Sequence, residues 1–205
     1  MPGLLGDFSF TWPYHAAAIA GYLLGSIPFG LLLTRSAGLG DIRKIGSGSI
    51  GATNVLRTGR KGLAAATVLL DGGKGAAAVL IARHWGPDTA ILAGCGALVG
   101  HLFPIWLRFK GGKGVATSLG VLLALDWRIG LLACATWLVV AFISRYSSAA
   151  SLSALALSPV FAWFIATRQL AAVALFIALL VWIRHHQNIG RLLRGEESKI
   201  RLRGS

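Results

Sequence analysis

Long apolar stretches with few charged residues are the feature that most restricts how this chain can fold. Seven such runs alternate with short segments that carry nearly all of the charge. A helix needs about 20 apolar residues to cross the hydrocarbon core of a bilayer. The sequence therefore predicts an all-α, polytopic integral membrane protein with a single domain over residues 1–205. The runs cover residues 14–34, 63–82, 89–107, 115–125, 129–143, 147–166 and 170–183.

The short fourth run, residues 115–125, leaves the number of crossings open on length alone. Charge tests the count, because Lys and Arg collect in cytoplasmic loops of membrane proteins. With seven crossings and an outer N-terminus, 16 Lys and Arg fall on the inner side, and only Arg83, Arg128 and Arg168 on the outer side. If the fourth run only dipped into the membrane, the basic tail from Arg184 would lie outside. We therefore predict seven transmembrane helices, with the N-terminus outside and the C-terminus cytoplasmic.

The composition argues against several other classes of protein. Hydrophobic residues make up 55% of the chain and charged residues only 13%, which is too little charge for a soluble domain. The net charge of +13 would fit a nucleic-acid-binding protein, but the charge count places the whole excess on one membrane face. No nucleic-acid partner is therefore predicted. Cys95 and Cys134 lie in apolar runs without metal-ligand or disulfide spacing, and no metal site is expected.

Small residues in two of the runs predict close helix packing. Gly21 and Gly25 are four residues apart, and so are Gly96 and Gly100. Helices in a membrane gain little from the hydrophobic effect when they associate, so small residues at this spacing let their backbones approach. We interpret these glycines as packing residues.

The first of three glycine-rich inner segments covers residues 46–54. It reads Gly-Ser-Gly-Ser-Ile-Gly-Ala-Thr-Asn and is followed by Arg57. The glycines satisfy a dinucleotide-binding spacing, but no strand is expected before them, so a Rossmann site is not predicted. Clustered glycines still let backbone N–H groups face an anion, and Arg57 can bind a phosphate through two nitrogens. The alternative is a solvated loop whose basic residues only follow the positive-inside rule.

The second segment, residues 109–117, reads Phe-Lys-Gly-Gly-Lys-Gly-Val-Ala-Thr. A nucleotide P-loop would need Ser or Thr directly after Lys113, where this chain has Gly114. Glycines before a helix N-terminus nevertheless form an anion site, and Lys113 supplies a positive charge. We expect this segment to bind a phosphorylated substrate rather than to be a simple connection.

The third segment, residues 184–194, contains His185 and Asn188. These two residues are three apart and share a face if the helix continues through them. The alternative is that the polar residues here only cap an interfacial helix. Glu196 and Glu197 follow, and we expect them to offset the charge of nearby arginines.

Polar groups within or at the ends of the runs have two possible roles. Asp71 and Lys74 are three residues apart in the second run and can neutralise each other, and His101 lies in the third run. Ionisable groups at such depth are often functional, but these could equally lock helices together. Ser148 opens the sixth run, where it could donate a hydrogen bond to a headgroup or cap the helix.

Together these motifs resemble the bacterial acyl-phosphate:glycerol-3-phosphate acyltransferases, the PlsY family. Two departures from the family pattern are Ser49, where Asn is frequent, and Gly72-Gly73, where bulkier residues are usual. The similarity extends from about Gly21 to Arg194. Besides the three segments above, it includes residues 25–30, 71–75, 100–104 and 145–146.

The resemblance implies a membrane enzyme that transfers a fatty acyl group from acyl phosphate to the 1-hydroxyl of glycerol 3-phosphate. The products would be lysophosphatidic acid and phosphate, and no cofactor or metal would be needed. The enzyme would lie in the bacterial inner membrane with its site on the cytoplasmic side. Its expected partners are membrane lipid and the enzyme that makes acyl phosphate.

An anion transporter or a non-catalytic scaffold remains as an alternative function, because basic loops and packing glycines are common in membrane proteins. Neither alternative explains three motifs of glycine and polar or basic residues on one face.

The resemblance also implies which residues form the site. The expected catalytic residues are Arg57, Lys113 and His185, and the expected substrate-binding residues are Ser47, Gly48, Asn54, Gly111, Gly112, Gly114, Ser148 and Asn188.

Overall fold

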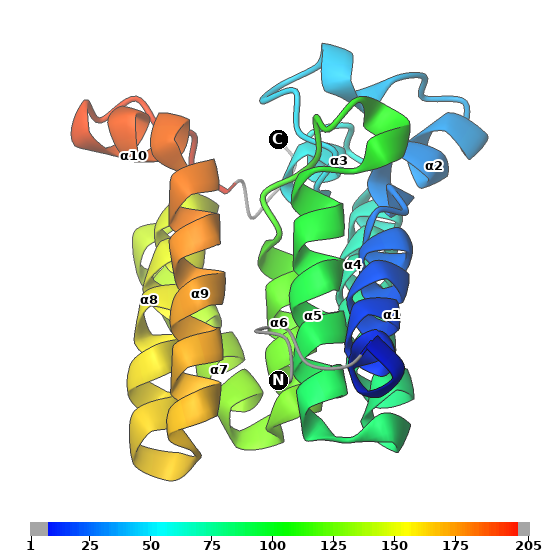
Figure 1. The fold of residues 1–205 in the computed structure, drawn as a ribbon. Helices are drawn as coiled ribbons and strands as arrows, with labels where there is room; N and C mark the ends of the chain where they lie inside the picture. Colours follow the sequence, from blue (N-terminus) through cyan, green and yellow to red (C-terminus); the bar gives the residue numbers. More distant parts are fainter. Residues whose placement is uncertain (1–7, 201–205) are drawn as a thin grey trace.

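The computed structural model describes residues 8–200, and over that range the regular structure is helical, as predicted (Figure 1). Asp7, Arg201 and Arg203, which entered the charge count, lie outside the described residues. Short 3₁₀ turns η1 (Ile42–Lys44), η2 (Arg83–Trp85) and η3 (Ile105–Leu107) lie between α-helices. The α-helices are α1 (Phe8–Gly25), α2 (Phe29–Ser36), α3 (Ala52–Leu56), α4 (Lys61–Ala82), α5 (Pro87–Leu102), α6 (Val115–Leu125), α7 (Trp127–Ser144), α8 (Ser147–Ile165), α9 (Arg168–Arg184) and α10 (His186–Leu193).

Several of these helices have the length and apolar character needed to cross a membrane. Within residues 8–200, five segments meet both conditions, and α9 with α10 would add a sixth as one span bent by 65°. Helix α6 is apolar but has only 11 residues. The structure supports a multi-pass membrane protein. The count of seven crossings and the outer N-terminus stay predictions.

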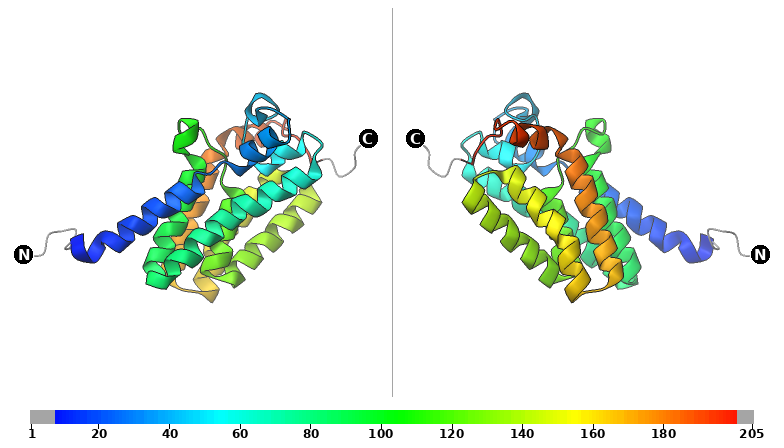
Figure 2. Two further views of the ribbon diagram at one scale, coloured as in Figure 1. Left: turned by 90° about the vertical axis from the view of Figure 1, so that its right-hand side faces the viewer. Right: turned by 90° about the vertical axis from the view of Figure 1, so that its left-hand side faces the viewer.

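The long helices run side by side, and their connections fall at two opposite ends (Figure 1). The turns between α4 and α5, α6 and α7, and α8 and α9 lie at one end. The glycine-rich segments and α10 lie at the other end, so the three predicted motifs share one side of the bundle. Helix α1 leans away from the others, and its N-terminal end projects from the bundle (Figure 2).

Helix α6 is short because the glycine segment before it enters the bundle as a non-helical chain. Beyond α5, Arg108 and Phe109 both have positive φ angles, of 52° and 62°, where the chain reverses. The following glycine segment then runs back beside the end of α5 and bonds to its last carbonyls. Helix α6 therefore begins inside the bundle, and its 11 residues rise only about 16 Å.

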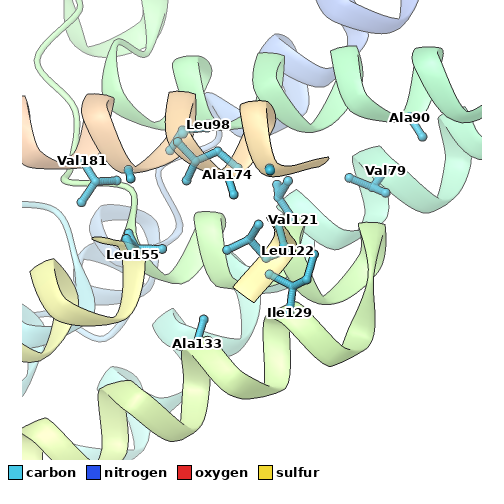
Figure 3. Close-up of a cluster of buried hydrophobic side chains, with 14 of the residues drawn as sticks. Val79, Ala90, Leu98, Val121, Leu122, Ile129, Ala133, Leu155, Ala174 and Val181 are labelled. Carbon is cyan, nitrogen blue, oxygen red and sulfur yellow. The ribbon is translucent and has the colours of Figure 1, made fainter. Parts of the chain in front are cut away.

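The core surrounds α6 with apolar side chains from its neighbours (Figure 3). Val121 and Leu122 of α6 pack with Leu98 of α5, Ile129 of α7 and Leu155 of α8, and all five are buried. Large apolar side chains on the outside of the bundle, by contrast, are exposed. This is the pattern expected of helices whose outer faces contact lipid.

The predicted packing glycines lie where α1 crosses α5, which confirms their role. A Cβ on Gly21 would overlap the backbone carbonyl of Ala93, and one on Gly100 would overlap that of Tyr22. Gly25 and Gly96 are equally close to the backbone of the opposite helix. The two helices therefore touch backbone to backbone, as small residues permit.

Replacing Gly21 by Ala should destabilise the bundle, because the added methyl has no space against α5. We expect the free energy of unfolding to fall by about 1–3 kcal/mol, the usual cost of overpacking. Gly73→Ala is the matched control, since Gly73 is an exposed glycine of α4 with open space around its Cα. The control should melt at the same temperature or higher, because Ala favours a helix. Equal melting temperatures in detergent for both variants would contradict the packing role.

Candidate active site

Eight of the 11 predicted site residues line one cavity of about 940 Å³. The cavity is lined by residues from α3, α4, α5, α6, α7, α8 and the junction of α9 with α10, together with the C-terminal tail. Gly48, Gly111 and Gly112 do not line it. The residues that do are Ser47, Asn54, Arg57, Lys113, Gly114, Ser148, His185 and Asn188.

Asn54 is the centre of the first glycine-rich segment. Its side-chain nitrogen lies 2.9, 2.8 and 3.2 Å from the carbonyl oxygens of Ile42, Ser49 and Ile45, which share its two hydrogens. Its side-chain oxygen accepts from the backbone N–H of Ser47 at 3.1 Å. A buried amide that makes four such bonds folds the loop around itself. Asn54 therefore shapes the loop that presents Ser47.

Arg57 reaches the cavity from the residue that follows α3. Its Nη1 lies 3.4 Å from the side-chain oxygen of Asn54, and its Nη2 donates to Ser198 Oγ at 2.7 Å. Gly46, with φ of 54°, lies against the guanidinium stem, where a Cβ would overlap Arg57 and Asn54. The loop glycine thus makes room for the cation.

The glycines of the second segment hold the loop rather than face the cavity. The N–H of Gly111 donates to Leu102 O at 3.2 Å, and the N–H of Gly112 donates to His101 O at 3.1 Å. Arg184 then donates to the carbonyl oxygens of both glycines at 3.2–3.3 Å. The backbone groups of Gly111 and Gly112 are therefore hydrogen-bonded to other parts of the protein. These two glycines support the loop that carries Lys113.

Lys113 and the start of α6 provide positive charge at the cavity. Lys113 donates to Asn188 Oδ1, and burial lowers the pKa of Lys113 to about 8. Gly114 precedes α6 with φ of 81° and makes no side-chain cap. The first N–H groups of a helix have no partner within the helix, and here Val115 and Ala116 line the cavity. This arrangement suits an anion at the helix N-terminus.

His185 and Asn188 are both buried and line the cavity, but not through the continuous helix on which the predicted shared face depended. Their residues are 2% and 5% exposed. The helix does not continue through them, however: it bends by 65° at His185, where α9 ends and α10 begins. His185 Nδ1 lies 2.7 Å from the carbonyl oxygen of Val181, which can only accept, so Nδ1 carries the proton and Nε2 is free to accept. Burial lowers the pKa of His185 to about 4.

The C-terminal tail contributes Glu197 to the same cavity. Its carboxylate accepts hydrogen bonds from Ser148 Oγ at 2.8 Å, Asn188 Nδ2 at 2.6 Å and Arg191 Nε at 2.6 Å. Burial opposes ionisation of Glu197, but these bonds outweigh it and lower its pKa. The N–H of Ile200 donates to Arg145 O at 2.7 Å and holds the tail in place. Ser148 is thus a donor in the site.

An apolar wall continues from the charged end of the cavity. It is formed by Val68 of α4, Leu119 of α6, and Trp137 and Leu138 of α7. Trp137 donates its indole N–H to Ser151 Oγ at 3.0 Å, which orients its ring. One cavity therefore joins a cationic end to an apolar side.

Two residues of the site were missed from the sequence. Arg184 was counted only as inner-face charge, and Glu197 was expected only to offset nearby arginines. Glu197 does pair with Arg191, but it also joins Ser148 to Asn188. Glu196 behaves as expected, since it pairs with Arg194 and both are exposed. The position of Arg184 directly before His185 was the available signal.

Comparison with known proteins identifies the family. Residues 15–195 match the model of a family described as glycerol-3-phosphate acyltransferase. The chain belongs to this family. A glycerol-3-phosphate acyltransferase of Mesorhizobium japonicum is 61% identical over 95% of this chain and 100% of its own length. One from Rhodospirillum rubrum is 64% identical over 96% of each chain.

Solved structures of PlsY, an integral membrane glycerol 3-phosphate acyltransferase, share the fold. The glycerol 3-phosphate form is 37% identical with a TM-score of 0.86, over 92% of this chain and 96% of that one. The lysophosphatidic acid form is 35% identical with a TM-score of 0.85, over 92% and 95%. The all-α fold and the acyltransferase resemblance are therefore confirmed. This chain is a membrane glycerol-3-phosphate acyltransferase of the PlsY type.

The lowered pKa of Lys113 predicts a pH dependence for the acyltransferase. Lys113 should be fully charged below about pH 7 and lose its charge as the pH rises through about 8. We expect kcat/KM for glycerol 3-phosphate, which reports the free enzyme, to fall above about pH 8. Lys113→Arg is the control, because a guanidinium stays charged throughout this range and should remove the fall. A wild-type profile that stays flat to about pH 9.5 would contradict this prediction.

Proposed function

We propose that this acyltransferase uses a fatty acyl phosphate as donor and the 1-hydroxyl of sn-glycerol 3-phosphate as acceptor. The products are lysophosphatidic acid and inorganic phosphate. The site lies on the cytoplasmic side of a bacterial inner membrane, which agrees with the excess of basic residues in the segments around it. An acyl-phosphate-producing enzyme would then be a functional partner.

The observation that carries the proposal is the cavity that joins cations to an apolar wall. An acyl phosphate has the same two parts, an anionic head and an alkyl chain. Arg57 suits the phosphate head, and Leu119, Trp137 and Leu138 suit the chain. Glycerol 3-phosphate, which is polar throughout, fits only the cationic end, where Lys113 and the N-terminus of α6 suit its phosphate.

The reaction needs little acid–base chemistry, because the donor is already activated. The hydroxyl oxygen of glycerol 3-phosphate attacks the acyl carbonyl carbon and forms the new ester bond. The bond between that carbon and the phosphate oxygen breaks, and phosphate leaves with the electron pair. The oxygens of the departing phosphate can take the hydroxyl proton, so all atoms and charges balance without another reactant.

Arg57 and Lys113 act as an electrostatic clamp. Negative charge develops on the carbonyl oxygen and on the leaving phosphate as the reaction proceeds. Donors fixed in place before the reaction stabilise such charge without the cost of reorganising water. Asn54 holds the loop of Arg57, and Arg184 holds the loop of Lys113, so both cations are positioned in advance.

His185 orients the acceptor hydroxyl. Its proton lies on Nδ1 toward Val181, so Nε2 can accept a hydrogen bond from the substrate. A group whose pKa is about 4 is a weak base near neutral pH. We therefore assign proton removal to the acyl phosphate itself and orientation to His185.

The donor is tested with purified protein in lipid, given labelled glycerol 3-phosphate and either palmitoyl phosphate or palmitoyl-CoA. Lysophosphatidic acid should form only from palmitoyl phosphate, because its phosphate head matches the cationic end of the cavity. Lys113→Ala should lower the rate about 100-fold or more, as loss of one electrostatic donor does. Product from the CoA thioester alone would show that the donor is wrong. Product from neither, with flux of labelled glycerol 3-phosphate into vesicles, would favour a transporter.

The role of His185 is tested by His185→Gln. The amide oxygen of Gln can still accept a hydrogen bond at about the position of Nε2, so we expect kcat to fall by about tenfold or less. The slope of the pH–rate profile should not change. A fall of about 10²–10⁴-fold with a changed slope would show instead that His185 removes the proton.

A further inference from the structure

Three ionisable residues lie buried within the bundle, below the cationic end of the cavity. Asp71 and Lys74 of α4 and His101 of α5 are 2%, 4% and 4% exposed. Lys74 Nζ donates to Asp71 Oδ1 and to the backbone carbonyl of Ile27, both at 2.7 Å. His101 Nδ1 lies 3.6 Å from Asp71 Oδ1, an electrostatic contact longer than a hydrogen bond. The cluster joins α4 and α5 to the break between α1 and α2.

Helix packing alone is a poor explanation for this cluster. Ionisable side chains inside a membrane are costly, and a buried ion pair often stabilises no more than apolar side chains of similar size. Apolar residues could therefore hold α4 and α5 together at lower cost. The position of the cluster indicates another role, because Asp71 and His101 line the same cavity as Lys113.

His101 contacts the glycine loop at Gly112 in two ways. Its backbone carbonyl accepts from the N–H of Gly112. Its imidazole also lies against Gly112, where a Cβ would overlap Nε2. Gly112 directly precedes Lys113, and Arg184 binds the Gly112 carbonyl. The loop is therefore held by the His101 ring, the end of α5 and Arg184.

Helix α4 also fixes the helix that follows the loop. A Cβ on Gly75 would lie 2.6 Å from Thr117 O, in the first turn of α6. A Cβ on Gly120 of α6 would overlap Gly72 O. The start of α6 therefore packs on the stretch of α4 that carries Asp71 and Lys74.

We propose that Asp71, Lys74 and His101 are positioning residues for the glycerol 3-phosphate site. Asp71 and Lys74 hold the His101 ring against Gly112. The ring in turn fixes the position of the loop that carries Lys113. This inference rests on the proposed function in one respect, that Lys113 contacts a substrate phosphate. It assigns a role to three residues that touch no reacting atom.

The test is a double-mutant cycle between Gly112 and His101. Gly112→Ala places a methyl against the imidazole, and we expect KM for glycerol 3-phosphate to rise about tenfold or more. His101→Ala removes the ring, and this loss of support should also raise KM. In the double variant the methyl occupies the vacated space, so KM should be no higher than in His101→Ala alone. Effects that simply multiply would overturn the proposal.

Gly111→Ala is the matched control. Its Cβ would overlap the backbone carbonyls of His101 and Leu102, which no change of the His101 side chain can relieve. Gly111→Ala should therefore gain nothing from His101→Ala. Relief in the Gly111 pair as well would show a general loosening of the bundle and would contradict a specific contact with Gly112.

A second variant keeps the proposal testable if the double variant is not recovered from membranes. His101→Gln keeps a neutral polar side chain near Asp71 but removes the flat ring under Gly112. KM for glycerol 3-phosphate should rise about tenfold, and KM for palmitoyl phosphate should change less than about twofold. An equal change in both constants, or none in either, would overturn the proposal.

Lys113→Ala separates this inference from the proposed function. If Lys113→Ala keeps the wild-type KM and kcat, the assigned role of Lys113 is wrong whatever the cycle shows. If Lys113→Ala loses activity but the Gly112 and His101 effects multiply, only the positioning role is wrong.

Discussion

Backbone polar groups buried inside a protein must find hydrogen-bond partners, because an unpaired buried group costs free energy. The segment between α5 and α6 meets this constraint without being helical. The N–H groups of Gly111 and Gly112 bond to the last carbonyls of α5, and their own carbonyls accept from Arg184. The rest of the site depends on this arrangement. It starts α6 inside the bundle, leaves the first N–H groups of α6 uncapped and brings Lys113 to a buried position.

Cations from distant parts of the chain meet around the cavity, and each is held by a hydrogen-bond acceptor. Arg57 bonds to Asn54, Lys113 to Asn188, and Arg191 to the tail carboxylate of Glu197. Neighbouring cations repel one another. Burial is the main cause of the lowered pKa of Lys113, and the arginines around it lower that pKa further. A bound phosphate would relieve that repulsion, which favours binding of anionic substrates.

The sequence was sufficient to predict the membrane class, the packing glycines and eight of the residues that line the cavity. Apolar runs and glycine motifs are local signals, so they can be recognised without knowledge of the fold. The roles of Arg184 and Glu197, by contrast, depend on contacts between segments far apart in the chain. Asn54 was expected to bind substrate, but its hydrogen bonds to the loop backbone became visible only once the loop was folded.

The depth of the reacting atoms follows from the geometry of the cavity. The cationic end is fixed by Lys113 and the start of α6, and the apolar wall begins one turn further along α6 at Leu119. In an acyl phosphate the carbonyl carbon is the atom that joins the phosphate to the alkyl chain. With the head of the proposed acyl-phosphate donor at Arg57 and its chain along Leu119, that carbon would lie at the junction of the two surfaces. His185 lines the same cavity, so glycerol 3-phosphate need not enter the apolar part, and the chain need not leave it, for the two to react.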